Sequence, residues 1–120
     1  TRVAIAKEAG ADYYISIHTN ASEYGDGASG FEAYIDYKND TITAMAQSIE
    51  QKLMQLGYTQ NRGLKSTQDS SLYVIDSNPV PAMLLELGFI TDSADAAYMC
   101  SEEGQNALAQ SIAQGILEQL

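Results

Sequence analysis

The order of apolar and polar positions predicts two strands near the start of the chain. Residues 13–17 form a β-prone run suited to a buried strand, and this run ends at His18. Over residues 31–37 apolar and polar side chains alternate, and a period of two is typical of a strand with one polar face. The segment between them, residues 19–30, holds Gly, Ser, Asn and Asp residues and predicts a long loop.

Helical patterns flank these strands. An Ala-rich run over residues 2–9 predicts the end of a helix, and Gly10 after it is a suitable stop. Asp40 can cap a second helix that Gly57 closes. The apolar stripe of this second helix consists of Ile42, Met45, Ile49, Leu53 and Leu56.

The second half of the chain predicts one interior strand and two helices. Residues 82–87 form an almost continuously apolar run, which favours a strand covered on both faces. Residues 91–93 offer caps for a short helix that reaches Met99, and Ser101 starts a last helix with acidic residues in its first turn. The stripe that we expect to face the core consists of Leu108, Ile112, Ile116 and Leu120.

Strands that alternate with helices indicate the α/β class. We expect a mostly parallel or mixed twisted sheet flanked by helices. A chain of 120 residues suits a single domain, residues 1–120. Residues 58–71 are polar and lack a clear period, which predicts a loop, and residues 72–75 suit a short strand or a helical turn.

Charge and composition exclude some classes of partner. The chain has 6 Lys and Arg against 16 Asp and Glu, a formal net charge of -10. This balance argues against binding to nucleic acid through phosphates, which depends on clustered cations. It also disfavours attraction to an anionic membrane surface. No apolar stretch approaches the roughly 18 residues that a membrane span requires.

His18 is the only histidine of the chain, and its position makes it a candidate functional residue. It closes a predicted buried strand and precedes a polar loop. Open α/β sheets place their sites at the carboxyl ends of strands. A structural role for a single His is the simpler hypothesis from residue type alone, so both stay open at this point.

Glu86 is the second candidate, because its neighbours in sequence are apolar. A carboxylate in such a run is seldom buried without a partner or a task. An apolar setting raises the pKa of a carboxyl group, which suits proton transfer near neutral pH. The alternative is that Glu86 forms an ion pair with Arg62 or Lys65, or accepts from a backbone amide.

Other chemistries find little support. Cys100 could in principle pair with His18 as a nucleophile, but no basic residue adjoins it in sequence to lower its pKa. The nucleophile elbow Gly-x-Ser-x-Gly is absent, and the Gly-rich residues 25–30 lack the Lys of a phosphate loop.

Two segments together resemble the zinc-dependent N-acetylmuramoyl-L-alanine amidase family. Residues 11–21, ADYYISIHTNA, are similar to its second-histidine segment, and residues 81–92, PAMLLELGFITD, are similar to its catalytic-glutamate segment. The intervening residues 61–65, NRGLK, and the helix that starts at Ser101 follow in the expected order. The similarity runs over essentially all of this chain.

The resemblance implies a specific chemistry. In that family two histidines and a glutamate hold zinc, and water takes the open position. His18 would then be the second histidine ligand and Glu86 the catalytic carboxylate, which takes a proton from water and passes it to the leaving amine. The bond cut would be the amide between N-acetylmuramic acid and L-alanine of the peptidoglycan stem peptide, the reaction of autolysins and endolysins.

We expect the zinc site of this chain to be incomplete. The family's first histidine and its glutamate ligand come from segments upstream of the point where Thr1 begins. The fold would thus be truncated at its N-terminus relative to the family domain, without the first strands of the sheet. An exposed sheet edge invites pairing, so self-association is a further expectation. Thr19, where the family commonly has a small residue such as Ala, is a milder departure.

The resemblance also implies a peptidoglycan or muropeptide substrate and an extracellular or cell-wall location. A competing hypothesis is a non-catalytic domain that folds or self-associates without zinc and at most binds cell-wall fragments. The two hypotheses differ in whether a longer parent protein supplies an upstream His and Glu. An unrelated α/β binding domain would require two long motif matches to arise by chance.

Overall fold

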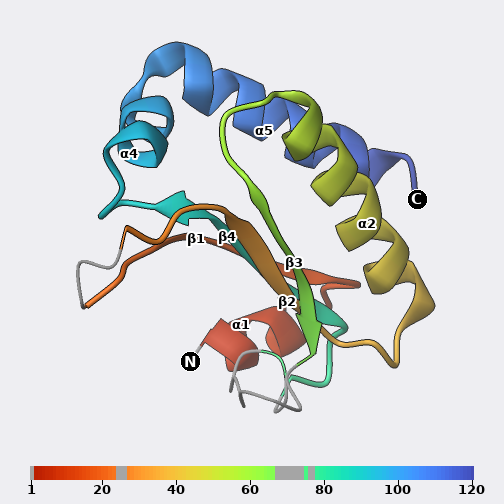
Figure 1. Ribbon diagram of the computed structural model, residues 1–120. Helices are drawn as coiled ribbons and strands as arrows, with labels where there is room; N and C mark the ends of the chain where they lie inside the picture. Colours follow the sequence, from red (N-terminus) through yellow and green to blue (C-terminus); the bar gives the residue numbers. More distant parts are fainter. Residues whose placement is uncertain (1, 24–26, 67–74, 76–77) are drawn as a thin grey trace.

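The computed structural model describes residues 2–23, 27–66, 75 and 78–120 (Figure 1). In chain order its elements are α1 (Arg2–Glu8), β1 (Tyr14–Asn20), β2 (Phe31–Ile35), α2 (Asp40–Gln55), β3 (Asn61–Ser66), β4 (Ala82–Phe89), α4 (Ser93–Cys100) and α5 (Glu102–Leu117). Side-chain oxygens of Asn39, Asp92 and Ser101 accept a backbone N–H in the first turn of α2, α4 and α5. These caps fix where the helices begin.

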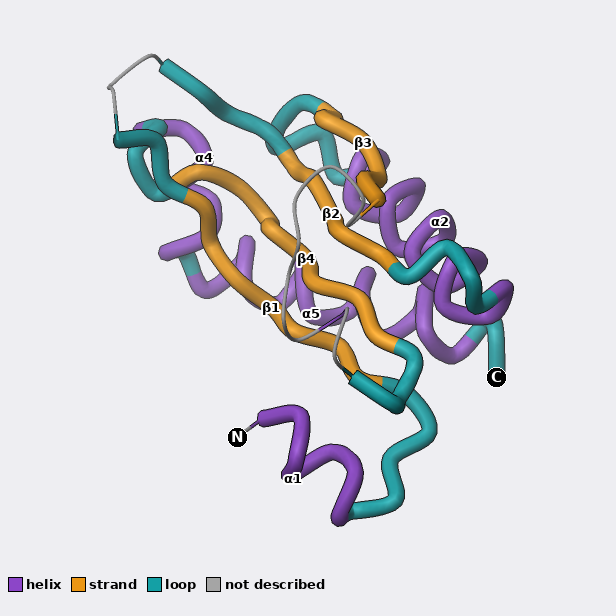
Figure 2. The backbone as a smooth tube through the Cα atoms, turned by 90° about the horizontal axis from the view of Figure 1, so that it is seen from below, coloured by secondary structure: helices purple, strands orange, loops and turns teal. Residues whose placement is uncertain are grey.

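The strands form one mixed sheet in the order β1-β4-β2-β3 (Figure 2). β4 lies in the interior, where it pairs parallel with β1 and antiparallel with β2, and β2 pairs parallel with β3. The mixed sheet and its flanking helices confirm the expected fold class. The interior position of β4 explains why its sequence is almost continuously apolar.

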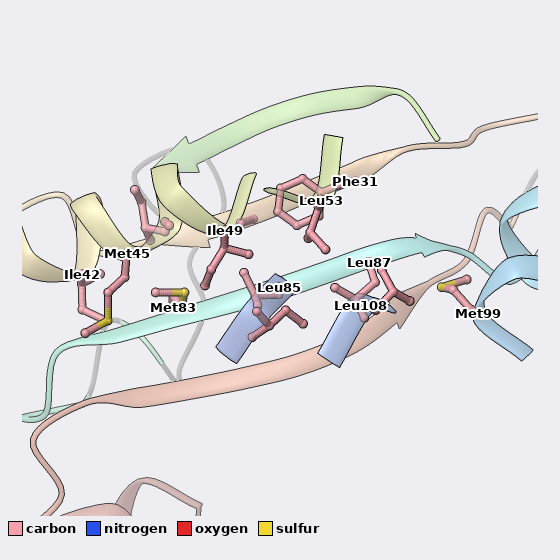
Figure 3. Packing of buried hydrophobic residues seen from close by; sticks show 14 residues of the cluster. Phe31, Ile42, Met45, Ile49, Leu53, Met83, Leu85, Leu87, Met99 and Leu108 are labelled. Carbon is pink, nitrogen blue, oxygen red and sulfur yellow. The ribbon is translucent and has the colours of Figure 1, made fainter. Parts of the chain in front are cut away.

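One face of the sheet is covered by α2, α4 and α5, whereas α1 lies on the other side, next to β1 (Figures 1 and 2). The main core fills the covered side. Figure 3 shows Met83 and Leu85 of β4 together with Ile49 of α2 and Leu108 of α5 in this layer. Burying such a side chain stabilises the fold by about 1.5–3 kcal/mol, so this layer fixes the strands that carry the site.

A glycine sets the close contact between the two longest helices. A Cβ on Gly115 of α5 would lie 2.6 Å from Cγ1 of Ile49 and 3.0 Å from its backbone nitrogen. A larger residue would therefore push α5 away from α2. The helical period alone does not reveal this requirement, because Gly is otherwise unfavourable inside a helix.

Most predicted elements are confirmed, but β3 was missed. Residues 61–66 fall in a segment that we expected to be a loop. β3 is a partly exposed edge strand held by parallel pairing with β2, so it carries no continuous apolar face. Pairing of this kind depends on a partner strand distant in sequence, which a local pattern cannot show. The expected element at residues 72–75 lies outside the described residues, apart from Ile75, which is buried.

Several predicted boundaries need correction. β1 continues through His18 to Asn20, and β2 ends at Ile35 rather than at residue 37. Asn39 caps α2 in place of Asp40. Leu120 does not face the core. It lies beyond the end of α5 and is 73% exposed, because the helix stops before its next apolar position. Among the described residues no helix has the length and apolarity to cross a membrane.

Candidate active site

His18 and Glu86 lie side by side on the face of the sheet opposite the main core. They are register partners on the parallel strands β1 and β4. Since successive side chains of a strand point to opposite faces, Met83, Leu85 and Leu87 turn toward the helices and Glu86 turns away from them. We call this second surface the site face; it carries Ser16, His18, Glu32 and Glu86. The structure thus brings both predicted residues to one place.

Ser16 orients His18. The Ser16 hydroxyl oxygen and Nε2 of His18 are 2.6 Å apart, a hydrogen bond between side chains two positions apart on β1. This bond holds one ring nitrogen and leaves Nδ1 as the second. A histidine that binds a metal commonly uses one ring nitrogen for the ion and the other for a fixed hydrogen bond. The geometry of His18 therefore suits a metal ligand, and Ser16 was not expected from the sequence.

Glu86 holds a buried carboxylate oxygen that no group in the described part of the chain satisfies. Its Oε2 is buried without a hydrogen-bond partner. Burial, and then the negative charge of Glu32, raises the pKa of Glu86 to about 7. A carboxyl group with this pKa can both hold and release a proton near neutral pH.

Glu32 of β2 stands opposite Glu86 and has the contrary environment. It is the register partner of Glu86 on the antiparallel strand and is 4% exposed. Its Oε1 accepts from Nδ2 of Asn20 at 2.8 Å, and its Oε2 accepts from Nζ of Lys65 and from Nε of Arg62. Burial acts to raise the pKa of Glu32, but the hydrogen bond and charge of Lys65, joined by Arg62, outweigh it and lower that pKa.

The two facing carboxylates are therefore separated in function by their partners. The alternative that Glu86 pairs with Arg62 or Lys65 is wrong, since both cations contact Glu32 instead. When the surroundings of two titratable groups give them different pKa values, the group whose pKa lies near 7 is the candidate for proton transfer. Glu32 is the fixed anion of this pair and Glu86 is the group that can exchange a proton.

Asp95 of α4 links the start of β2 to the end of β4 by hydrogen bonds. Its Oδ2 accepts from the backbone nitrogen of Gly30 at 3.0 Å and from that of Phe89 at 2.9 Å, and the side chain is 1% exposed. Gly88 lies against Asp95, because a Cβ there would be 3.1 Å from this same oxygen. The buried carboxylate thus joins the start of β2 to the end of β4.

Cys100 takes no part in this arrangement. It ends α4, on the helix-covered side of the sheet, and it is exposed. His18 lies on the site face, so the two side chains are on opposite sides of the sheet. The hypothesis of a Cys-His nucleophile pair is therefore not supported.

Glu32 was not among the site residues predicted from the sequence. The only local indication was that Glu32 alternates with apolar neighbours, which placed it on the polar face of a strand. That β2 runs antiparallel beside β4, and so puts Glu32 opposite Glu86, depends on sheet order. Asn20 was missed because β1 was expected to end at His18.

The residues of the site face fit part of a zinc site. Imidazole nitrogen and carboxylate oxygen are both ligands that zinc accepts. His18, anchored by Ser16, supplies the first kind, and the unpartnered Oε2 of Glu86 stands beside it. No three His, Cys, Asp or Glu side chains within the described ranges are grouped so as to hold a metal ion. These ranges contain one predicted ligand rather than a full set.

Comparison with known proteins agrees with the resemblance seen in the sequence. A family model described as N-acetylmuramoyl-L-alanine amidase (Amidase_3) matches residues 1–118. The chain is 40% identical over 117 residues to the uncharacterized protein YqiI of Bacillus subtilis, which covers 96% of this chain and 54% of that relative. It is 34% identical over 116 residues to the N-acetylmuramoyl-L-alanine amidase LytC of Bacillus subtilis, covering 95% of this chain and 23% of LytC.

A solved structure has the same fold. The N-acetylmuramoyl-L-alanine amidase AmiC2 of Nostoc punctiforme superposes with a TM-score of 0.83 and 31% sequence identity, over 97% of this chain and 62% of that chain. The present chain therefore spans about half the length of YqiI and less than two thirds of the AmiC2 chain.

Proposed function

This chain belongs to the N-acetylmuramoyl-L-alanine amidase family, and we propose that it carries out the proton-transfer part of peptidoglycan amide hydrolysis. The bond cut is the amide between N-acetylmuramic acid and L-alanine of the stem peptide. The family match over residues 1–118 supports the reaction class. The amidase LytC, a relative by sequence, supports the substrate class.

One observation carries the assignment of roles. His18 and Glu86 are in register on adjacent parallel strands, and Oε2 of Glu86 is buried without a partner. A structural carboxylate at this position would be expected to have a hydrogen-bond donor. Glu32, one strand away, has such donors, whereas Oε2 of Glu86 has none among the described residues. The unpaired oxygen is thus better explained by a function in which Glu86 meets water or substrate.

Glu86 is assigned the role of general base and then general acid. With a pKa of about 7 it is partly deprotonated near neutral pH, so it can accept a proton from the attacking water. The same carboxyl group then donates that proton to the nitrogen of the leaving L-alanine. Glu32 remains ionised throughout, and its negative charge helps Glu86 to hold the proton between the two steps.

Zinc is the proposed cofactor, and His18 is the residue of this chain that would hold it. A bound zinc ion would polarise the amide carbonyl and lower the pKa of a coordinated water. Catalytic zinc sites use three protein ligands, so His18 would act together with further ligands. The Ser16 hydroxyl keeps the imidazole in place for this contact.

A cell-wall or extracellular location follows from the substrate. Peptidoglycan lies outside the cytoplasmic membrane, and the Staphylococcus aureus protein LytH, 30% identical over 105 residues, is described as a probable cell wall amidase. We accordingly propose that the chain acts on peptidoglycan or on muropeptides released from it.

Hydrolysis of muropeptides tests the proposed function. We expect the zinc-loaded protein to release L-alanyl peptides, and Glu86→Gln to lower the rate by about 10²–10⁴-fold, the usual contribution of a general acid–base group. Glu103→Gln on the exposed first turn of α5 is the matched control and should keep the rate.

Two results would contradict this proposal in different ways. Full activity of Glu86→Gln would remove Glu86 from the mechanism. Absence of hydrolysis by the unaltered protein would favour the competing hypothesis of a non-catalytic domain. Calorimetric titration with zinc adds a readout without turnover: binding that His18→Ala weakens is expected, and equal binding by both proteins would show that His18 is not a ligand.

A further inference from the structure

Arg62 at the start of β3 is held more firmly than an ordinary surface arginine. Its guanidinium carbon lies 5.1 Å from the centroid of the Phe89 ring at the end of β4. On another side its aliphatic stem lies close to Gly30, where an added Cβ would be 2.7 Å from Cγ of Arg62. Gly30 has φ +126, a conformation that larger residues rarely adopt. The guanidinium is therefore pre-oriented by two elements.

Neutralising Glu32 does not require Arg62. Lys65 already forms a close ion pair with Oε2 of Glu32, whereas Nε of Arg62 lies 3.5 Å from the same oxygen, at the limit of a hydrogen bond. Two of the chain's 6 cations thus meet one carboxylate in a protein of net charge -10. The cluster of Glu32, Lys65 and Arg62 keeps one surplus positive charge.

No described residue forms a hydrogen bond or ion pair with the terminal nitrogens of Arg62, so these nitrogens can bind an anion. Only Nε contacts Glu32, and the side chain is 35% exposed. The planar terminal fork of an arginine matches both oxygens of a carboxylate, which makes such pairs strong and directional. The position also suits the site, because Arg62 contacts Glu32, the register partner of Glu86, and stacks on Phe89 of the same strand as Glu86.

We propose that Arg62 is a substrate-specificity residue that binds a free carboxylate of the stem peptide beside Glu86. This inference rests on the proposed function, since it takes the peptide of a muropeptide as the ligand. Phe89, Gly30 and Glu32 hold the guanidinium in place, so little side-chain entropy is lost when the carboxylate binds. Lys65 forms its ion pair with Glu32 and does not contact the carboxylate of the ligand in this proposal.

A binding measurement with two matched ligands tests the proposal. The ligands are N-acetylmuramoyl-L-alanyl-D-glutamate and its analogue in which both glutamyl carboxylates are amides. Binding to the 120-residue chain is measured by calorimetry with a chelator present, so that hydrolysis does not contribute. We expect the acid to bind roughly tenfold more tightly than the amide, because hydrogen bonds between charged groups contribute about this much to affinity.

Three variants locate the preference. Arg62→Gln should bind acid and amide equally, and Arg62→Lys should lose most of the preference because it keeps the charge but not the fork. Arg62→Lys also keeps the stem that packs against Gly30, which guards against loss of folding, and circular dichroism checks both variants. Arg2→Gln on the exposed α1 is the control and should retain the preference.

The outcomes separate this inference from the proposed function. Equal binding of acid and amide by the unaltered chain, or a preference that survives in a folded Arg62→Gln, would overturn the role of Arg62 alone. Binding of neither ligand would contradict the muropeptide assignment and this inference together. A preference retained in full by Arg62→Lys would assign the effect to charge and contradict bidentate recognition.

Discussion

The two faces of the sheet differ in what their side chains are required to do. On the helix-covered face, Met83 and Leu85 of β4 are fully buried among aliphatic side chains of α2 and α5 (Figure 3). On the site face of the same strand, Glu86 is a partly buried acid, and one of its oxygens has no partner in the part of the chain that the structure describes. The side chains of β4 that point to one face therefore stabilise the fold, and Glu86 on the other face is available for chemistry. The two sets are separated because successive side chains of a strand point to opposite faces.

A second contrast lies within the site face. Glu32 and Glu86 are register partners, but the donors Asn20, Lys65 and Arg62 all contact Glu32. A fully paired acid stabilises the fold, and an unpaired acid in an apolar setting is destabilising unless it holds a proton. The difference indicates that selection for folding explains Glu32, whereas Glu86 requires a functional explanation.

Substitution of neighbouring leucines should show the largest difference between the faces. Leu85 is 0% exposed in the main core, so Leu85→Ala should lower the free energy of unfolding of the chain by about 4 kcal/mol. Leu84 packs on the site face in a smaller cluster with Ile75 and Ala82, so Leu84→Ala should lose about 2 kcal/mol. Urea unfolding followed by circular dichroism measures both. Equal losses would show that the site face contributes as much packing as the covered face.

Removing each acid in turn should affect stability in opposite ways. Glu32→Gln leaves Lys65 and Arg62 without their carboxylate. Both cationic side chains are more than a third exposed. Water therefore screens them, and the loss of unfolding free energy should be only about 1–2 kcal/mol. Glu86→Gln removes a buried unpaired acid and should leave stability at pH 8 unchanged or raised. Urea unfolding at that pH compares them, and a larger loss for Glu86→Gln would contradict the contrast drawn between the two residues.

The pH dependence of stability should separate the acids further, as a smaller effect. The pKa of Glu86 is raised to about 7 in the folded chain, so between about 4.5 and 7 the folded state holds a proton that the unfolded state has lost. Glu86 therefore makes stability fall as pH rises through this window, and Glu86→Gln should remove that slope. The pKa of Glu32 is lowered, so its stabilisation is present above pH 4.5 and is lost as the pH falls below that value.

Thermal unfolding across a pH series measures both slopes. The difference between Glu32→Gln and the unaltered chain should shrink below pH 4.5, and the difference between Glu86→Gln and the unaltered chain should change between about 4.5 and 7. A Glu86→Gln variant that keeps the slope of the unaltered chain would show that Glu86 ionises normally.

Sequence patterns predicted the covered face well, because its side chains follow the period of their own element. The stripe of α2 from Ile42 to Leu53 is buried as expected. The interior strand around Leu85 was also predicted from its apolar run alone. Leu120 shows the limit, since a stripe extrapolated by period does not reveal where the helix ends.

The site face was predicted only at two points. His18 and Glu86 were found because each is unusual in its local sequence. Glu32 looks like an ordinary polar strand residue, and its importance comes from the antiparallel pairing of β2 with β4. Arg62 lies in β3, an edge strand that the sequence did not reveal. Residues whose role depends on strand order thus require the structure.

A direct titration by carbon NMR shows whether the site face holds one fixed anion, Glu32, and one acid that can exchange a proton, Glu86. We expect Glu86 to titrate at about pH 7 and Glu32 below 4.5 in the same folded chain. If Glu86 titrated near 4.5, or below Glu32, it would be an ordinary carboxylate. The role proposed for it in amide hydrolysis would then lose its physical basis.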